Sequence, residues 1–330
     1  MRISIAMCTY NGADYLPAQL DSIARQTVSP EEVVICDDGS TDTTLDIAQE
    51  FAQTVPFKIR IFKNKQNLGS TKNFEHAIRL CEGDLIALSD QDDIWHPQKL
   101  AVLSALFKQD NTIGGVFSDG DILQEDLQLT GRTLWRSFSF DQKEQRRFRS
   151  GKCADVLLRR NVVTGMTLMF RSALRDKLLP IPGSWVHDGW LAFMLILHSR
   201  LHPCPECLVG YRTHERQSLG PPLSTAEKVR SIAHHGVADI LAGVRSRNLL
   251  EYERQIVQFD DLAAYLRNNM GQITASLLAP ASAKAGHARA AIVALSHSKR
   301  QRFQGVVGRA GGYRRYSQLR LLAMCRDLII

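Results

Sequence analysis

The stretch Leu-Ile-Ala-Leu-Ser-Asp-Gln-Asp-Asp-Ile-Trp at residues 85–95 places an apolar run directly before three carboxylates. Four consecutive apolar residues are typical of a strand buried on both faces. Asp90, Asp92 and Asp93 would then lie at the carboxyl end of that strand, where open α/β sheets bind ligands. Crowded carboxylates repel one another unless a cation neutralises them, so the stretch predicts a site for a hard divalent metal that also holds a phosphate. The alternative is a solvated turn before a helix at 97–108.

Short apolar runs alternate with helical periodicity along the first 120 or so residues. Strands are expected at 3–8, 32–36, 58–62, 85–88 and 115–118. The second of these strands also ends in acids, at Asp37 and Asp38, and Asp42 is placed to cap the helix that follows. This alternation predicts an α/β fold with a mostly parallel, right-handed wound sheet, flanked by helices, that collects its acid-rich loops along one edge.

The second half of the chain has a weaker pattern. Residues 132–152 are basic with interleaved aromatic side chains, and we interpret them as a flexible flap. Beyond them we expect a strand at 162–170, an apolar helix at 187–197, a strand at 207–211, a linker at 220–222 and helices from 224 to 330. The sequence therefore predicts a helical C-terminal extension after the wound sheet.

Length and composition fit a protein with a sizeable core. With 330 residues, 44% of them hydrophobic, the chain can form one large domain with an appendage or two domains. No run approaches the roughly 20 apolar residues of a membrane-spanning helix, and the N-terminus enters a strand without a signal peptide. We therefore expect a cytoplasmic protein.

The seven cysteines lie mostly in apolar patterns, which indicates reduced core residues rather than a disulfide framework. Cys204 and Cys207, with His198 and His202 nearby, suggest zinc as an alternative. The absence of a second cysteine pair argues against that zinc site.

The net charge of +7 is concentrated near the C-terminus. Against a single acid, Asp327, the tail carries ten lysines or arginines, at positions 284, 289, 299, 300, 302, 309, 314, 315, 320 and 326. Such a tail favours an anionic partner, either nucleic acid or an anionic membrane surface. A solvated basic face is the third interpretation.

Six blocks of residues, in order, resemble the family 2 inverting glycosyltransferases of the GT-A fold. The blocks are Cys-Thr-Tyr-Asn-Gly at 8–12, Asp-Asp-Gly-Ser-Thr-Asp at 37–42, Asn-Leu-Gly at 67–69, Ser-Asp-Gln-Asp-Asp-Ile-Trp at 89–95, His-Asp-Gly-Trp at 187–190 and Tyr-Arg-Thr-His at 211–214. Within the family, the chain looks like the bacterial rhamnosyltransferase-like enzymes that build surface polysaccharides. The resemblance covers roughly residues 1–220 and implies a Rossmann-like sheet.

The resemblance assigns roles to residues that match the family's motifs. It implies contacts with a nucleotide-sugar from Thr9, Asn11, Asp38, Lys72, Asp90 and Gln91. It also implies that Asp92 binds a divalent metal, Mg²⁺ or Mn²⁺, and that His214 completes the metal or phosphate site. Such a metal keeps open positions for both phosphates and stabilises the departing diphosphate. For His214, a packed core histidine is the alternative.

Asp188 matches the family's catalytic base, and His187 stands where an acid is usual. Inverting transfer needs one base near the acceptor hydroxyl and no covalent intermediate. A structural cap at a helix N-terminus is the alternative for Asp188. We expect His187 and Trp190 near the acceptor. The Gln-x-x-Arg-Trp motif of processive synthases is absent, which favours one sugar per encounter.

The expected protein is a metal-dependent glycosyltransferase with a catalytic domain at 1–222 and a basic helical region at 223–330. It would move one sugar from a nucleotide-sugar donor, for which dTDP-rhamnose is our first choice, to a lipid-linked saccharide acceptor. We expect peripheral attachment to the anionic inner face of the cytoplasmic membrane and no nucleic acid partner, with homo-oligomer formation left open. The alternatives are a sugar nucleotidyltransferase and a non-catalytic nucleotide-binding or membrane-docking module.

Overall fold

The structure is a computed structural model that describes residues 1–217, 237–269 and 272–296. Its contacts divide the chain into two compact units. Unit 1 consists of Met1–Ser150 and Val162–Pro221, and unit 2 consists of Gly151–Asn161 and Pro222–Ile330. The division after residue 221 lies next to the boundary we expected from the sequence. The assignment of residues 151–161 to the C-terminal unit was not expected.

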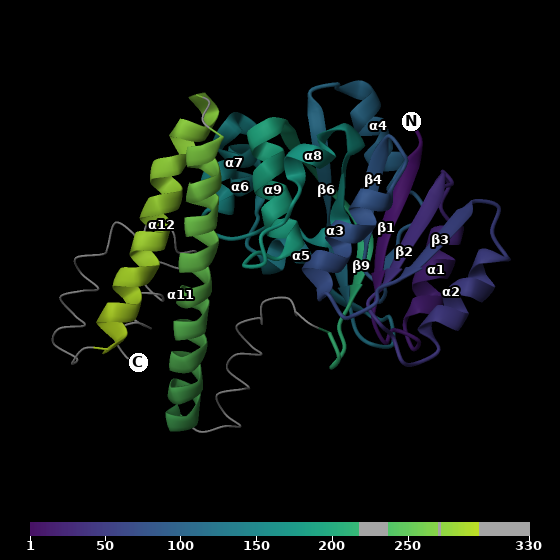
Figure 1. Ribbon diagram of the computed structural model, residues 1–330, viewed down its shortest axis with the longest axis horizontal. Coiled ribbons are helices and arrows are strands. Elements are labelled where there is room, and N and C mark those ends of the chain that lie inside the picture. The colour runs from purple at the N-terminus through teal and green to yellow at the C-terminus, as the bar shows by residue number, and fades with distance from the viewer. Residues whose placement is uncertain (218–236, 270–271, 297–330) are drawn as a thin grey trace. The chain divides into compact units, whose positions relative to one another are not determined.

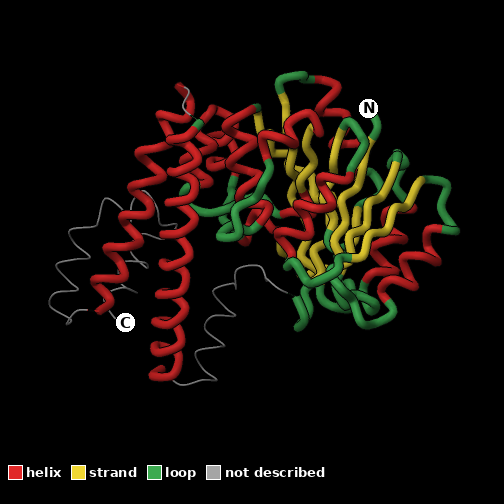
Figure 2. The backbone as a smooth tube through the Cα atoms, in the orientation of Figure 1, coloured by secondary structure: helices red, strands yellow, loops and turns green. Residues whose placement is uncertain are grey.

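Unit 1 is built on one sheet, and its described residues form nine strands (Figures 1 and 2). The strands are β1 (Ile3–Thr9), β2 (Glu32–Asp37), β3 (Lys58–Lys63), β4 (Leu85–Ser89), β5 (Ile94–Trp95), β6 (Ile113–Leu123), β7 (Leu129–Thr133), β8 (Leu168–Arg171) and β9 (Arg200–Arg212). Their order is β3-β2-β1-β4-β8-β6-β9-β5, and β7 pairs with β6. The α/β fold is confirmed.

Helices pack along this sheet. The α-helices of unit 1 are α1 (Leu16–Ala24), α2 (Thr44–Ala52), α3 (Ser70–Leu80), α4 (Lys99–Gln109), α5 (Leu134–Ser137), α6 (Gln142–Arg147), α8 (Arg175–Leu178) and α9 (His187–His198). Short 3₁₀ turns at Gly165–Thr167 and Ser172–Leu174 flank β8, and a π-helical turn spans Phe148–Lys152. The connection from β3 to β4 returns across the sheet, which packs α3 on β1 and β2.

The two halves of the sheet differ in strand direction. Strands β1 to β4 pair in parallel, but β8 lies between β4 and β6 and runs antiparallel to both. The second half is mixed rather than mostly parallel, because β6 and β9 pair in parallel whereas β5, β7 and β8 pair antiparallel with their neighbours. The strand expected at 162–170 begins only at residue 168, and β5 and β7 were not predicted.

The parallel half forms the core that positions the acidic loops. Strands β2 and β4 are buried along their whole length, and Ile5, Val34 and Leu88 are fully buried. Burying each such side chain stabilises the fold by about 1.5–3 kcal/mol. The register places Thr9 beside Asp37 and Met7 beside Ser89, so these strands end at the same edge.

The basic stretch at 132–152 is not a flap. Its aromatic rings pack with Phe117 of β6 in a buried cluster that contains Trp135, Phe140 and Phe148. Ring centroids of Trp135 and Phe140 lie 4.9 Å apart at 83°, an edge-to-face arrangement that adds to burial. These aromatics belong to the core.

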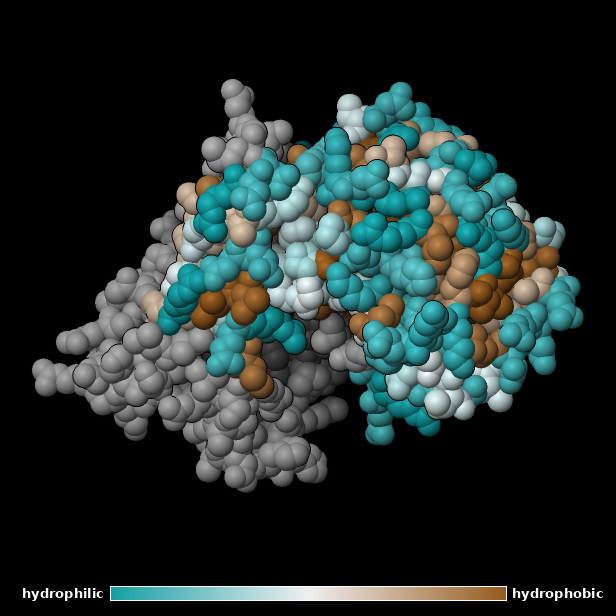
Figure 3. Space-filling view, viewed as in Figure 1, coloured by the Kyte–Doolittle hydropathy of each residue, from teal (hydrophilic) through white to brown (hydrophobic). Residues whose placement is uncertain are grey.

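The face of unit 1 seen in Figure 3 is mainly hydrophilic, with scattered hydrophobic patches.

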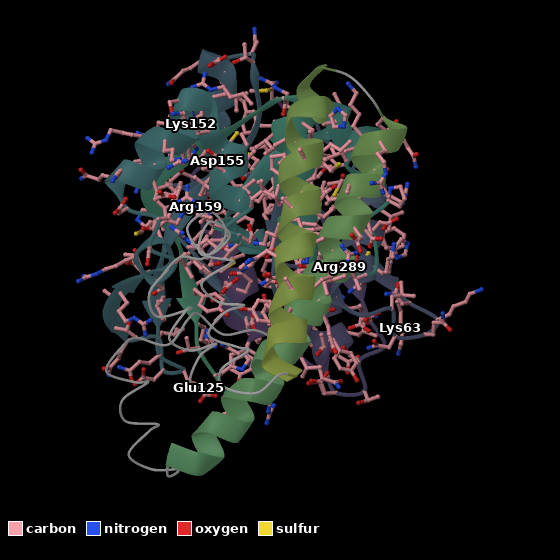
Figure 4. All side chains as sticks on the ribbon, turned by 90° about the vertical axis from the view of Figure 1, so that its left-hand side faces the viewer. Lys63, Glu125, Lys152, Asp155, Arg159 and Arg289 are labelled. Carbon is pink, nitrogen blue, oxygen red and sulfur yellow. The ribbon has the colours of Figure 1, made fainter. Side chains whose placement is uncertain are left out.

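Unit 2 contains the short helix α7 (Cys153–Leu157) and two long helices, α11 (Val237–Asn268) and α12 (Gln272–Ser296), that pack side by side (Figure 1). Alanines of α12 allow close approach to Tyr252 of α11. Figure 4 labels Lys152, Asp155 and Arg159 along the shorter segment. Within the described residues, no helix is both long and apolar enough to cross a bilayer.

Two of the ten basic tail residues have internal partners. Lys284 is buried and donates to the carbonyl of Leu158, while Arg289, labelled in Figure 4, pairs with Asp260. Lys284 is therefore not exposed to an anionic partner. The other eight, at 299 and beyond, lie outside the described residues.

Candidate active site

The acidic loop, residues 90–93, follows β4 and is largely withdrawn from solvent. Asp93 is 1% exposed, and within the described part of the chain neither of its carboxylate oxygens has a hydrogen-bond partner. An unpaired buried carboxylate is costly, because its ionised form loses hydration without compensation. The interpretation of this loop as a solvated turn is therefore wrong.

The carboxylates of the loop perturb one another. Burial, followed by the charges of Asp92 and Asp188, raises the pKa of Asp90 to about 8. Burial, followed by the charges of Asp92 and Asp90, raises the pKa of Asp93 well above its usual range. Because both pKa values are raised, Asp90 and Asp93 resist ionisation in the absence of a cation. A bound divalent ion would reverse the effect.

A buried lysine lies behind the acidic loop. Lys99, at the start of α4, donates to the carbonyl of Met166 at 2.6 Å, and its Nζ lies 3.2 Å from the centroid of the Trp95 ring. Burial lowers the pKa of its ammonium group well below the usual range, and Asp93 and Asp90 oppose that shift. The sequence analysis did not single out Lys99, because a lysine beside a predicted helix start normally indicates a solvated position.

The pairing of β5 with β9 brings a histidine to the loop. Ile94 lies opposite Gly210 in an antiparallel register, so the residues that follow Gly210 approach those that precede Ile94. The Nε2 atom of His214 lies 2.9 Å from Oδ2 of Asp92, although the two residues are 122 positions apart. The imidazole side chain is 3% exposed, and its Nδ1 has no partner within the described residues.

The pair of Asp92 and His214 fits a divalent cation held jointly with a ligand. Across the parts of the chain that the structure describes, no cluster unites three or more histidine, cysteine, aspartate or glutamate side chains as a metal site. An all-protein cage is thus not formed there. Mg²⁺ sites in nucleotide-binding enzymes commonly use one or two carboxylates together with substrate phosphates, and Asp92 supplies one such carboxylate. The imidazole of His214 is a ligand that transition metals accept more readily than Mg²⁺ does.

The zinc alternative gains no support. The six cysteines in the described residues are free, and Cys204 and Cys207 lie on β9 beside a register shift against β6. Among the described residues, neither cysteine belongs to a cluster of three or more potential metal ligands.

The turn after β1 is held by Gln91. The side-chain amide of Gln91 accepts from the Tyr10 backbone N–H at 2.8 Å and donates to the Tyr10 carbonyl at 3.0 Å. A Cβ on Gly12 would lie 2.1 Å from Oε1 of Gln91, so any side chain there would displace the Gln91 amide. The predicted nucleotide contact Gln91 therefore uses its amide to position the backbone of this turn.

The other predicted residues of this edge also support the turn. Thr9 donates to Asp37, and Asn11, at a positive φ of 46°, accepts from the Thr41 N–H at 2.9 Å. Asp38 accepts from the Asn64 amide and from the N–H groups of Leu68 and Gly69, each at 2.8 Å. A carboxylate has about four acceptor sites, so Asp38 retains about one.

Lys72 does not join the acidic loop. Its ammonium donates to Glu75 at 2.9 Å and to the carbonyl of Ile181 at 2.6 Å. No contact among residues 1–217 links it to Asp90 or Asp92. The assignment of Lys72 to a diphosphate stays a prediction, and its side chain, which is 42% exposed, would have to leave Glu75 to make that contact.

Asp188 lies in the first turn of α9, where the helix dipole favours an ionised carboxylate. It is close enough to the acidic loop to raise the pKa of Asp90, and it also raises the pKa of the half-buried Tyr211, after burial and the three acids of the loop. The structure thus brings Asp188 together with the acids at the end of β4. Tyr211, which the sequence analysis did not assign, lies among all four.

The neighbours of Asp188 belong to the core. His187 stacks on Phe74 with ring centroids 4.0 Å apart, and a Cβ on Gly165 would lie 2.4 Å from its Nε2. Burial lowers the pKa of His187 to about 3, so the ring is neutral. Trp190 is 2% exposed and donates to the carbonyl of Leu178. Both predicted acceptor contacts are corrected, because neither side chain is open to a ligand.

The fold and this site define the class of protein. The chain resembles TarS of S. aureus, solved in complex with UDP-GlcNAc, with a TM-score of 0.59 and 17% identity over 100% of this chain and 89% of that one. It also resembles the mannosyltransferase of Pyrobaculum calidifontis solved with GDP-Man and Mn²⁺, with a TM-score of 0.53 and 18% identity over 99% and 86%. The fold is GT-A.

A family model described as glycosyl transferase family 2 matches residues 4–177, and the chain belongs to that family. An uncharacterised glycosyltransferase of Nostoc sp. is 29% identical over 226 residues, 65% of each protein. Chondroitin synthase of Escherichia coli is 35% identical over 116 residues, which are 35% of this chain and 17% of that enzyme. The matches thus span less than two thirds of these two relatives.

Proposed function

We propose that the protein is a metal-dependent, inverting glycosyltransferase that moves one sugar per encounter from a nucleoside diphosphate donor. The observation that carries this proposal is the contact between Asp92 and His214 at the edge where β1, β2 and β4 end. Membership of glycosyl transferase family 2 supports the reaction class over a sugar nucleotidyltransferase or a non-catalytic module.

Asp92 and His214 would hold Mg²⁺ or Mn²⁺, which neutralises the diphosphate as it leaves. Asp90, at the first position of the Asp-x-Asp motif, is assigned to the donor's ribose. The mannosyltransferase of P. calidifontis, which shares the fold, was solved with Mn²⁺. The unpaired oxygens of Asp93 add negative charge behind this position, so a cation would also relieve the repulsion within the acidic loop.

Asp188 is proposed as the general base. In an inverting displacement, an acceptor hydroxyl attacks C1 of the sugar, its proton passes to a carboxylate, and the bond from C1 to the diphosphate oxygen breaks. The position of Asp188 in the first turn of α9 favours the ionised carboxylate through the helix dipole. Its electrostatic effect on Asp90 supports a position near the donor.

The base of the nucleotide is assigned to the turn after β1 and to Asp38. The remaining acceptor site of Asp38 suits a ring N–H, as in uracil or thymine, and both are compatible with dTDP-rhamnose or a UDP-sugar. We retain dTDP-rhamnose as the donor to test first. A homo-oligomer is compatible with these assignments.

The acceptor is proposed to be a lipid-linked saccharide, reached from the cytoplasmic membrane surface. The eight basic residues at 299 and beyond would attract anionic lipid, at roughly 1 kcal/mol each near such a surface. Removal of residues 297–330, which leaves α11 and α12 intact, should abolish flotation with anionic vesicles. Unchanged flotation would eliminate the tail as the anchor.

A thermal-shift screen tests the donor and metal together. The purified protein is heated with dTDP-rhamnose, UDP-sugars and GDP-sugars, each with Mn²⁺ or with EDTA. A bound donor stabilises the fold by mass action, about 2.7 kcal/mol at 100 times Kd. We expect stabilisation by one donor class that EDTA removes. Stabilisation unaffected by EDTA would contradict the metal assignment, and no shift with any nucleotide-sugar would contradict the function.

A further inference from the structure

Tyr15, immediately before α1, contacts the segment that carries His214. Its ring stacks on the imidazole of His214, with centroids 4.1 Å apart and planes at 26°. The guanidinium of Arg212 lies 5.3 Å from the centroid of the same ring. Tyr15 is 8% exposed. The contact therefore occurs in the interior and joins residues about 200 positions apart in the sequence.

The hydroxyl group of Tyr15 is also fixed. It donates to Oε1 of Glu125 at 2.9 Å, in the turn between β6 and β7 (Glu125 is labelled in Figure 4). The backbone N–H of Tyr15 donates to the carbonyl of Gly12 at 3.0 Å, which ties the residue to the turn held by Gln91. The ring plane is thus set by contacts at both of its ends.

Metal-binding histidines usually donate their second ring nitrogen to a carbonyl or carboxylate, which fixes the orientation of the ring. His214 lacks this support within the described residues, because its buried Nδ1 has no partner there. The face-on contact with Tyr15 therefore restrains the plane of the imidazole, in addition to the hydrogen bond between Nε2 and Asp92. An ion pair of Asp14 with Arg216 adds little, because both side chains are more than 60% exposed.

We infer that Tyr15 is a positioning residue, which holds the His214 ring so that Nε2 faces Asp92 and the metal. This inference rests on the proposed function, since it assumes that a metal binds Asp92 and His214. Tyr15 also belongs to the turn assigned to the nucleotide. It therefore links the position of that turn to the metal site, through a ring that touches neither metal nor donor.

The test compares Tyr15→Leu and Tyr15→Phe with the wild type, using Mn²⁺ alone as the probe. Electron paramagnetic resonance of free Mn²⁺ gives the dissociation constant, and the nitrogen modulation in spin-echo spectra reports a directly bound imidazole. Loss of an outer-shell partner typically costs 10–100-fold in metal affinity, so Tyr15→Leu should bind about tenfold more weakly and lose nitrogen modulation. Tyr15→Phe keeps the stacked ring and should stay within about threefold.

Phe51→Leu is the matched control, because Phe51 is a partly buried aromatic of α2 that pairs with Phe57 away from this site. It should bind Mn²⁺ like the wild type. If Tyr15→Leu does not fold, Tyr15→Met keeps apolar burial without the stacked ring and carries the same expectation. Unchanged affinity and nitrogen modulation in the folded Leu or Met variant would overturn the inference and leave the proposed function intact. Failure of the wild type to bind Mn²⁺, either alone or in the presence of UDP, would overturn both.

Discussion

Two acidic loops at the same edge of the sheet have similar sequences and opposite surroundings. Asp37, at the end of β2, accepts from Thr9, from the Gly39 N–H and from both the N–H and hydroxyl of Ser40. These four bonds fill its acceptor capacity. Asp93, after β4, is equally buried and has no partner within the described residues. Aspartates that look alike in the sequence therefore differ in role, and the supply of local donors separates Asp37 from Asp93.

The largest expected effect is on activity, at the loop whose acids are unpaired. Asp92→Asn should lower kcat at least about 10³-fold, because the metal contributes several kcal/mol of charge stabilisation when the diphosphate leaves. Its melting temperature should not fall. Steady-state transfer assays with the best donor from the thermal-shift screen check this. Wild type in excess EDTA should lose activity to the same degree, and a normal rate in either case contradicts the metal role.

The second largest effect is a loss of activity on replacement of Asp188, which interacts with the acidic loop. Asp188→Asn should lower kcat by about 10²–10⁴-fold, the usual contribution of a general base, with little change in donor affinity. Measuring kcat and the donor Kd separately distinguishes the roles. A variant that lost donor binding but kept its turnover rate would make Asp188 a structural cap of α9.

The third prediction concerns stability at the loop whose acids are satisfied. Asp37→Asn should lower the free energy of unfolding by about 2–4 kcal/mol, because an amide cannot accept all four donors and leaves buried polar groups unpaired. Denaturant titration measures this. Asp92→Asn is the control that should show no such loss, and equal stability of the two variants would remove the distinction between the loops.

The smallest effect is a pH dependence of the metal-free protein. The raised pKa values of Asp90, about 8, and Asp93 mean that the folded state binds more protons than the unfolded state above the usual carboxyl range. Unfolding free energy should therefore fall as pH rises from about 4 to about 8, by on the order of 1–2 kcal/mol. Asp93→Asn should reduce this fall, and Mn²⁺ should offset it. A stability that rises across this range would contradict burial of these acids.

The regular features of the first half could be predicted because each depends on local sequence. The strands and helices up to residue 118 follow from short apolar runs and helical spacing, and the shared edge follows from parallel strand direction. The second half could not, because β8 enters the sheet between β4 and β6 from a distant part of the chain. β5 has only two residues, too few to show any periodicity.

For the candidate site, motifs located Asp92, Asp188 and His214 but not their environment. Sequence spacing could not reveal that Trp190 and His187 turn into the core, because both packing and ligand contact favour such residues near a helix start. Nor could sequence spacing reveal that Tyr15 packs on His214, because the two residues are about 200 positions apart. A signal for Tyr15 does exist. It lies three residues after Gly12 of the Asn-Gly turn, at the point where the chain enters α1.

Strand β8 also constrains how the sheet is assembled during synthesis. When residue 150 leaves the ribosome, β1 to β7 are all available, but β4 has a neighbour only on the β1 side and β6 pairs only with the short β7. Both inner edges then expose unpaired backbone groups beside fully apolar strands, a state prone to pairing with other chains. The gap closes only after residue 171 has been made. The two halves of the sheet are therefore joined by a strand encoded about 80 residues after β4, and the sheet is complete only when β9 has paired with β6 and β5. Nascent chains stalled before residue 171 should be the species that need a chaperone.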